Sequence, residues 1–179
     1  MLREAGNVMR KKVLLVCLLL ISAAVLLSQC KRPATEPEAA VQVGQAAPQF
    51  KLPDLKGREF ALDQYRGKIV LLDFWATWCG PCRMTMPLLE KLQHEFPNDL
   101  ALLAINLQEP DDVVREYIRE QNISSQVLLD KEGSVGLAYG AESIPMQILI
   151  DRNGITRDIQ LGFSPGMASQ LRDEIQKLR

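Results

Sequence analysis

An unbroken apolar segment followed closely by two cysteines is the feature that most constrains the fold. Residues 68–75 read Lys-Ile-Val-Leu-Leu-Asp-Phe-Trp, the pattern of a strand that is buried on both faces of a sheet. The sequence Cys79-Gly80-Pro81-Cys82 follows after a short loop, and a helical pattern begins there. A strand of this kind needs a layer of structure on each side of its sheet, so we expect one α/β domain.

Strand-like and helix-like segments alternate along the rest of the chain. We predict strands at residues 50–52, 58–62, 68–75, 100–107, 127–129, 146–151 and 155–161. The first two flank a turn at 54–57 and predict a hairpin, and Asn153-Gly154 predicts a second hairpin. Strands and helices in alternation, then a hairpin and a helix, indicate one mixed sheet covered by helices.

The predicted helices have expected ends and buried faces. Helices should begin at the cysteines, at Asp111 and near Gly133, and Ser164 should cap the last helix with Pro165 at its first position. In the first helix, the apolar residues predicted to face inward are Met84, Leu88, Leu89, Leu92 and Phe96. The corresponding residues are Val113, Val114, Tyr117 and Ile118 in the second helix, and Met167, Leu171, Ile175 and Leu178 in the last.

The N-terminal segment has the pattern of an export signal. Three basic residues, 10–12, precede an uncharged apolar run at 13–27, which as a helix would reach about 22 Å and not the roughly 30 Å of a bilayer core. Leu27-Ser28-Gln29-Cys30 resembles a bacterial lipobox, and we expect lipidation at Cys30. An uncleaved anchor and simple secretion are the alternatives. All three place the domain on the extracytoplasmic, periplasmic side of the membrane.

Composition and charge complete the organisation of the chain. Residues 31–43 contain two prolines and no apolar periodicity, so we expect a leader at 1–30, a flexible tether at 31–43 and a folded domain at 44–179. Lysine and arginine number 21 against 22 acidic residues, a net charge of -1, which gives no electrostatic footprint for nucleic acid. Without residues 1–29 the net charge would be -4.

The dithiol carries the chemistry predicted for this domain. Cys79 falls where a loop becomes a helix, and the free backbone N–H groups and helix dipole there favour a thiolate. Cys82 lies one turn into the helix, so the two sulfurs can form a reversible disulfide. No metal is expected, because structural zinc takes four ligands and the single histidine, His94, lies about 18 Å along the same helix.

The sequence from Gly44 onward resembles the membrane-tethered, thioredoxin-like redoxins of the TlpA/ResA family. The resemblance rests on Gly-Gln-Ala-Ala-Pro-Gln-Phe at 44–50 and on Phe-Trp-Ala-Thr-Trp-Cys-Gly-Pro-Cys at 74–82. It implies a thioredoxin-like three-layer α/β fold, with a central mixed β-sheet flanked by helices and an N-terminal β-hairpin extension. It also implies a protein-disulfide reductase that works by thiol-disulfide exchange without a cofactor.

The same resemblance implies roles for single residues. Cys79 matches the exposed nucleophile and Cys82 the buried resolving thiol. Trp78 matches the aromatic residue beside the nucleophile, and Ile144-Pro145 matches the cis-proline loop that offers backbone hydrogen bonds to an extended substrate. Trp78, Ile144 and Pro145 are therefore the expected substrate-binding residues.

Asp73 interrupts the apolar strand, where desolvation should raise the pKa of its carboxyl. By resemblance it is the buried aspartate that accepts the proton of the resolving cysteine. The alternative is an aspartate satisfied by neighbouring backbone N–H groups. The sequence departs from the family at Thr85, where ResA-type members often carry a glutamate, and this leaves a role in cytochrome c biogenesis open.

The resemblance also implies partners, while two rival functions stay open. The expected electron source is a membrane thiol-disulfide transporter, and the expected targets are oxidised cysteines of exported proteins, apocytochrome c among them. A thiol peroxidase of the redoxin class is one rival, although Thr77 is two rather than three residues before Cys79. A copper-binding metallochaperone is the other, but its usual pattern has three residues between the cysteines and a distant histidine.

Overall fold

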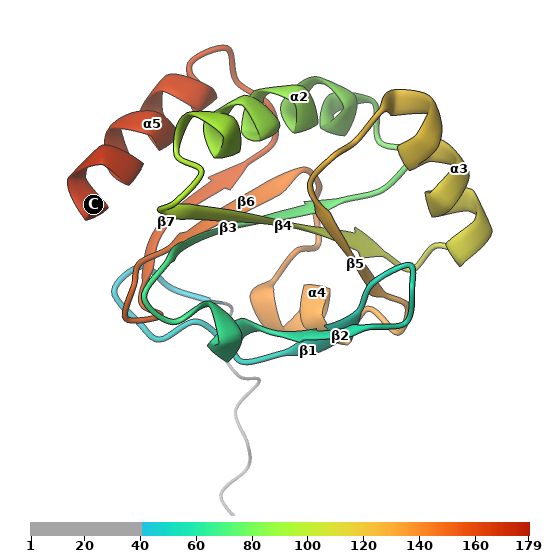
Figure 1. Cartoon of the computed structure of the whole chain (residues 1–179), viewed down its shortest axis with the longest axis horizontal. Coiled ribbons are helices and arrows are strands. Elements are labelled where there is room, and N and C mark those ends of the chain that lie inside the picture. The colour runs from blue at the N-terminus through green and yellow to red at the C-terminus, as the bar shows by residue number, and fades with distance from the viewer. Residues whose placement is uncertain (1–40) are drawn as a thin grey trace, which may run out of the picture. The chain divides into compact units, whose positions relative to one another are not determined.

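The computed structural model describes residues 41–179 (Figure 1). The predicted leader, the predicted lipidation site Cys30 and residues 31–40 of the predicted tether lie outside this range. The elements are β1 (Lys51–Pro53), β2 (Glu59–Ala61), the 3-10 helix η1 (Leu62–Tyr65), β3 (Ile69–Trp75), α2 (Gly80–Glu95), β4 (Leu100–Leu107), α3 (Asp111–Gln121), β5 (Gln126–Asp130), α4 (Ser134–Tyr139), β6 (Met146–Ile150), β7 (Thr156–Leu161) and α5 (Met167–Leu178). Within residues 41–179, no helix has the length and apolar character needed to cross a membrane.

The central sheet has the mixed topology that the sequence predicts. Its five strands are ordered β5-β4-β3-β6-β7. The pairs β3/β4 and β4/β5 are parallel, whereas β6 runs antiparallel to β3 and β7 antiparallel to β6. β1 and β2 form the predicted hairpin as a separate two-stranded sheet. The thioredoxin-like fold with an N-terminal hairpin extension is thereby confirmed.

Two layers cover the central sheet, one on each face. Figure 1 shows α2 and α5 across one face, with the hairpin, η1 and α4 across the other. The side chains of β3 divide between the two layers, as the alternation of a strand requires. Val70, Leu72 and Phe74 join the cluster on the hairpin side, and Ile69 and Leu71 join the cluster beneath α2 and α5.

Residues just before the predicted start at Gly44 already pack on the domain. Val41 is already buried in the cluster on the hairpin side of the sheet. The Gly44 N–H then donates to the carbonyl of Thr156 at 2.8 Å, which fastens this segment to the start of β7.

The buried stripe predicted for α2 is wrong at two positions. Met84 is 49% exposed and Leu88 is half-buried, whereas the buried residues of this helix are Cys82, Thr85, Met86, Leu89 and Leu92. A spacing of every four residues drifts around a helix that has 3.6 residues per turn, so its members cannot all lie on the buried face. Leu92 and Phe96 are buried, and Met84 and Leu88 are not. In α3 the predicted inward residues Val114, Tyr117 and Ile118 do face the core, Val114 fully buried and the other two partly buried, whereas Val113 is 43% exposed.

The last helix begins later than predicted. Its first residue is Met167 and its N-cap is Gly166, so Ser164 and Pro165 do not occupy the predicted cap and first positions. The Met167 N–H donates to the Ser164 carbonyl at 3.1 Å. This bond closes a four-residue turn with Pro165 at its second position, which the fixed φ of proline favours.

The two faces of α2 give a direct stability test. Leu89→Ala removes a fully buried side chain from the cluster under α2 and should lower the free energy of unfolding by about 2–5 kcal/mol. Met84→Ala on the same helix should change it by less than about 0.5 kcal/mol. Urea unfolding of both variants measures the difference, and equal losses would contradict the assignment of the faces.

Candidate active site

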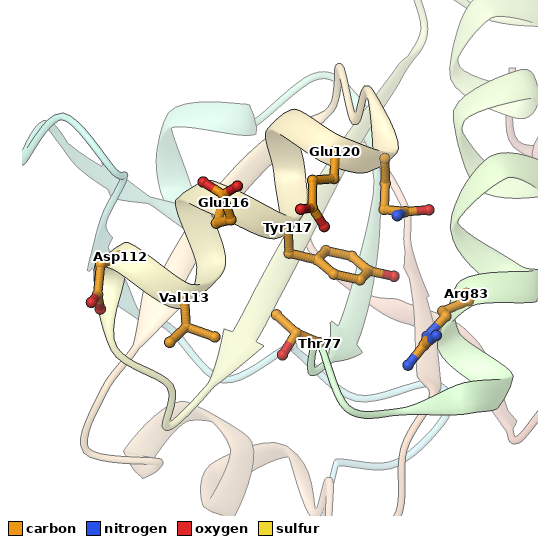
Figure 2. A pocket seen from close by; sticks show the side chains of 8 residues that line it. Thr77, Arg83, Asp112, Val113, Glu116, Tyr117 and Glu120 are labelled. Carbon is orange, nitrogen blue, oxygen red and sulfur yellow. The ribbon is translucent and has the colours of Figure 1, made fainter.

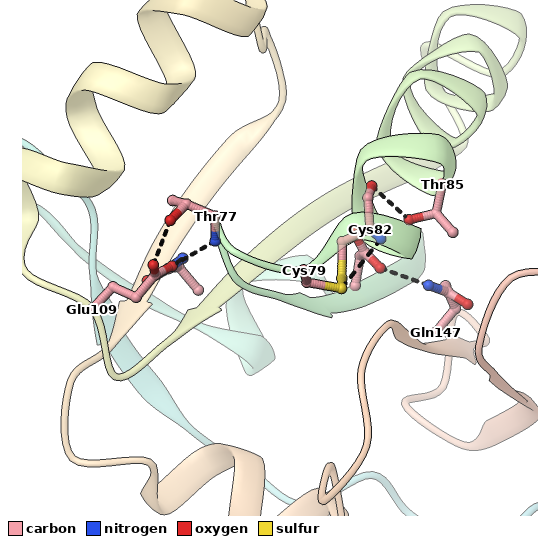
Figure 3. Close-up of a disulfide and its surroundings, with 8 residues drawn as sticks. Thr77, Cys79, Cys82, Thr85, Glu109 and Gln147 are labelled. Atoms are coloured by element: carbon pink, nitrogen blue, oxygen red, sulfur yellow. Dashed lines mark hydrogen bonds between the residues drawn. A yellow bond between two sulfur atoms is a disulfide. The ribbon is translucent and has the colours of Figure 1, made fainter.

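The dithiol lies where β3 delivers the chain to α2. Cys79 is the N-cap residue of α2, and Cys79 and Cys82 form a disulfide. The backbone N–H of Cys82 donates to Cys79 Sγ at 3.2 Å, a bond drawn in Figure 3. This donor belongs to the first turn of α2, so Cys79 receives the stabilisation of a helix N-terminus that favours a thiolate.

The expected difference in exposure between the two cysteines is absent from this disulfide form. Cys79 and Cys82 are both 3% exposed, so the expectation of an exposed Cys79 is wrong here. Both belong to one buried cluster at the end of β3, and Ile144 packs against that cluster. The hydrogen bond to Cys79 Sγ, rather than exposure, is what distinguishes the two sulfurs.

The expected substrate-binding residues lie on two loops. Trp78 is 69% exposed in the loop between β3 and α2. Ile144 and Pro145 immediately precede β6, and the peptide bond between them is cis, as the family pattern implies. The structure therefore brings Ile144 to the dithiol cluster and leaves Trp78 free at the surface.

Asp73 is completely buried in the middle of β3. Alternation along the strand directs its side chain to the face covered by α2, the helix that carries Cys82. Gln147 Nε2 donates to Asp73 Oδ1 at 2.7 Å, and Oδ2 has no hydrogen-bond partner among residues 41–179. Burial raises the pKa of Asp73 from 3.8 to about 7, against a smaller lowering by the Gln147 bond. The expected direction of this shift is confirmed.

Glu109 is a site residue that the sequence analysis missed. Its carboxylate accepts hydrogen bonds from the Thr77 backbone N–H at 2.7 Å, the Thr77 hydroxyl at 2.5 Å and Asn106 Nδ2 at 2.7 Å. Figure 3 shows Glu109 and Thr77 beside the disulfide loop. Glu109 thus fastens the loop before Cys79 to the end of β4. Its position after a strand parallel to β3 is the signal that could have identified it.

A groove opens next to this loop between α2 and α3 (Figure 2). Its volume is about 670 Å³, and its lining includes Thr77, two residues before Cys79. Arg83 of α2 faces Tyr117 of α3, and α3 adds three carboxylates to its wall at Asp112, Glu116 and Glu120. Within residues 41–179, no group of three or more histidine, cysteine or acidic side chains is placed to hold a metal ion.

Comparison with known proteins agrees with this geometry. A model of the AhpC/TSA family matches residues 43–159. The thioredoxin-like protein YneN of Bacillus subtilis is 38% identical over 131 residues, covering 72% of this chain and 76% of that protein. The thiol-disulfide oxidoreductase ResA of Geobacillus kaustophilus is 36% identical over 163 residues, covering 90% of this chain and 91% of its own.

A solved structure gives the same result. The putative thiol:disulfide interchange protein DsbE from Chlorobium tepidum superposes with a TM-score of 0.73 at 31% identity, covering 78% of this chain and 99% of its own. A thioredoxin-like fold with a disulfide at the start of α2 defines a thiol-disulfide oxidoreductase. The chain belongs to the AhpC/TSA family of redoxins, and within it to the thioredoxin-like group that contains ResA.

Because the Asp73 carboxyl is buried, we predict that Asp73→Asn becomes more stable than wild type as the pH rises. Folding raises the pKa of Asp73 to about 7, so the native protein loses stability as the pH rises from about 4 to about 7. Asparagine cannot ionise, and the free energy of unfolding of the variant should gain up to about 4 kcal/mol over wild type across that interval. Urea unfolding of the two oxidised proteins from about pH 4 to about pH 8 measures the gain. A difference that does not change with pH would contradict it.

Proposed function

We propose that this protein is an extracytoplasmic, membrane-tethered reductant of disulfides in exported proteins. The observation that carries the proposal is the Cys79–Cys82 disulfide at the N-terminus of α2, above a buried carboxyl that can exchange a proton near neutral pH. The export-signal pattern of residues 1–30 supports the location and the tether, with Cys30 as the attachment site.

The reaction transfers two electrons from the dithiol to a substrate disulfide. The Cys79 thiolate attacks one substrate sulfur, forms a mixed disulfide and releases the other substrate sulfur as a thiolate. Cys82 then gives its proton to Asp73 and attacks Cys79 Sγ, which releases the second substrate thiolate. The two substrate thiolates take up one proton from Asp73, directly or through water, and one from water. The substrate then ends as a dithiol and the protein as the Cys79–Cys82 disulfide, the form seen in the structure. Asp73 Oδ2 is the oxygen available for that proton.

A second dithiol must then reduce the protein. A membrane thiol-disulfide transporter that carries cytoplasmic electrons outward is the source of this dithiol in the proposal. The reducing direction is supported by Gly80 and Pro81, the pair that thioredoxins have between their cysteines. Apocytochrome c is one candidate among the exported substrates.

The surroundings of the dithiol suit an extended polypeptide. Ile144 and Pro145 offer the backbone beside the disulfide, and Trp78 offers an exposed aromatic surface. The groove of about 670 Å³ next to Thr77 gives room for the chain that flanks the target cysteine. The Thr77 hydroxyl is bonded to Glu109, an arrangement that favours disulfide exchange over the rival peroxidase function, because the hydroxyl is not left to act at Cys79.

Trapping of mixed disulfides tests the roles of the two cysteines. Cys82→Ser cannot resolve the intermediate and should accumulate substrate proteins bound through Cys79. Cys79→Ser is the matched control and should accumulate none. Non-reducing electrophoresis and mass spectrometry of membranes that express each variant provide the measurement. Equal trapping by the two variants would overturn the assignment of roles to the two cysteines. If the trapped proteins are cytoplasmic, the proposed extracytoplasmic location is overturned.

The direction of electron transfer has a separate test. A glutathione redox titration of the purified protein should give a potential near that of thioredoxin, about -270 mV. A value near about -120 mV, the potential of the oxidant DsbA, would reverse the proposed direction. Rapid turnover of hydrogen peroxide without a protein disulfide would instead favour the peroxidase.

A further inference from the structure

Asp73 has two neighbours across the sheet, and one of them is polar. In the strand register Asp73 pairs with Ala104 of β4 and with Gln147 of β6. The methyl group of Ala104 cannot form a hydrogen bond, whereas Gln147 Nε2 donates to Asp73 Oδ1 at 2.7 Å. Both Asp73 and Gln147 are completely buried, so water does not compete for this bond.

The bond gives the two carboxyl oxygens of Asp73 different environments. The amide N–H occupies Oδ1, while Oδ2 lacks a partner within the described part of the chain. A hydrogen bond to the ionised form of an acid favours that form, so Gln147 offsets part of the effect of burial. Burial and Gln147 are the two causes of the shift in the pKa of Asp73, and no charged side chain on β4, β6 or α2 within residues 41–179 contributes to it.

Gln147 is also placed close to the expected substrate loop. It lies on β6, two residues after Pro145 of the preceding loop, and Figure 3 shows its amide directed toward the disulfide. The strand that presents the cis-proline loop to substrate therefore also holds the proton acceptor under the dithiol.

We propose that Gln147 is the positioning residue of the proton acceptor: it holds Asp73 by Oδ1, leaves Oδ2 to exchange the proton, and sets the pH range in which the carboxyl titrates. The inference rests on the proton role proposed above for Asp73. Gln147 does not touch the reacting sulfurs in this scheme and acts through Asp73.

The test removes the donor to Asp73 in one variant and withdraws it from reach in another. Gln147→Met keeps the length of the side chain and removes the donor, and Gln147→Asn keeps the amide but shortens its reach. In both full-length variants the titration midpoint of the Asp73 carboxyl, followed by carbon NMR of the oxidised protein, should move to higher pH by about one unit or more. A shift of this size is expected when a hydrogen bond to a charged group is lost.

Gln160→Met is the matched control. Gln160 is the register partner of Gln147 on β7, and its amide donates to Asp158 rather than to Asp73. This variant should leave the Asp73 midpoint in place. If the Gln147 variants also leave the Asp73 midpoint in place, the inference is overturned. This holds even if they lower the melting temperature, because a glutamine with a purely structural role would do the same.

The pH dependence of the resolving step separates this inference from the proposed function. With insulin as the disulfide substrate, Gln147→Met should displace the pH-rate profile by the same amount as the NMR midpoint. Asp73→Asn should abolish the pH dependence that the Asp73 carboxyl contributes to the rate. Gln147→Met should then cause no further displacement of the profile in the Asp73→Asn variant. If Asp73→Asn leaves the profile unchanged, the proton role fails, while the NMR midpoint still decides whether Gln147 controls the carboxyl.

Discussion

Burial of β3 on both faces is the constraint on which the rest of the structure depends. A strand in the centre of a covered sheet must send alternate side chains into two separate layers. Val70, Leu72 and Phe74 face the hairpin layer, so Leu71, Asp73 and Trp75 face the helices. The same strand delivers the chain to α2 at Cys79. The carboxyl and the dithiol are thus placed on one side of the sheet by a single backbone.

Burying the Asp73 carboxyl in that layer destabilises the folded protein, and we attribute its presence there to the proposed proton transfer. Asp73 is desolvated, has a single side-chain donor and leaves one oxygen without a partner among residues 41–179. An apolar residue there would make a more stable strand. Buried acids whose pKa lies near neutrality cluster at sites of proton transfer, where that value is useful. The loss of stability and the proposed proton transfer therefore both follow from the same desolvation.

Local pattern in the sequence was sufficient to predict the elements but not the contacts between them. The run at 68–75, the Asn153-Gly154 turn and the position of the dithiol are local signals, and the structure confirms each of them. The face of α2 was predicted wrongly at Met84 and Leu88, and the apolar spacing did not indicate that Cys82 and Thr85 are buried. Their burial is decided by closure of the disulfide and by the bond from the Thr85 hydroxyl to the Cys82 carbonyl.

Glu109 and Gln147 could not be predicted from local pattern for a related reason. Each acts on a residue far away in the sequence, Glu109 on Thr77 and Gln147 on Asp73. Such pairs depend on which strands become neighbours and in which register, and local pattern along the chain does not specify either. The family resemblance did supply Asp73 and the cis-proline loop, because those features belong to the fold as a whole.

The equal burial of the two cysteines means that electrostatics, rather than access, must assign their roles. Among residues 41–179 the backbone donor to a cysteine sulfur is the Cys82 N–H, and it bonds Cys79. That donor and the positive end of α2 favour negative charge on Cys79, which suits it to attack first. Cys82 lies deeper in a helix that packs over Asp73, where a second negative charge would be unfavourable. In the proposed mechanism a thiol in that position needs a base that accepts its proton as it reacts. Asp73, which accepts a hydrogen bond from Gln147 and has a pKa of about 7, is the base proposed for that role.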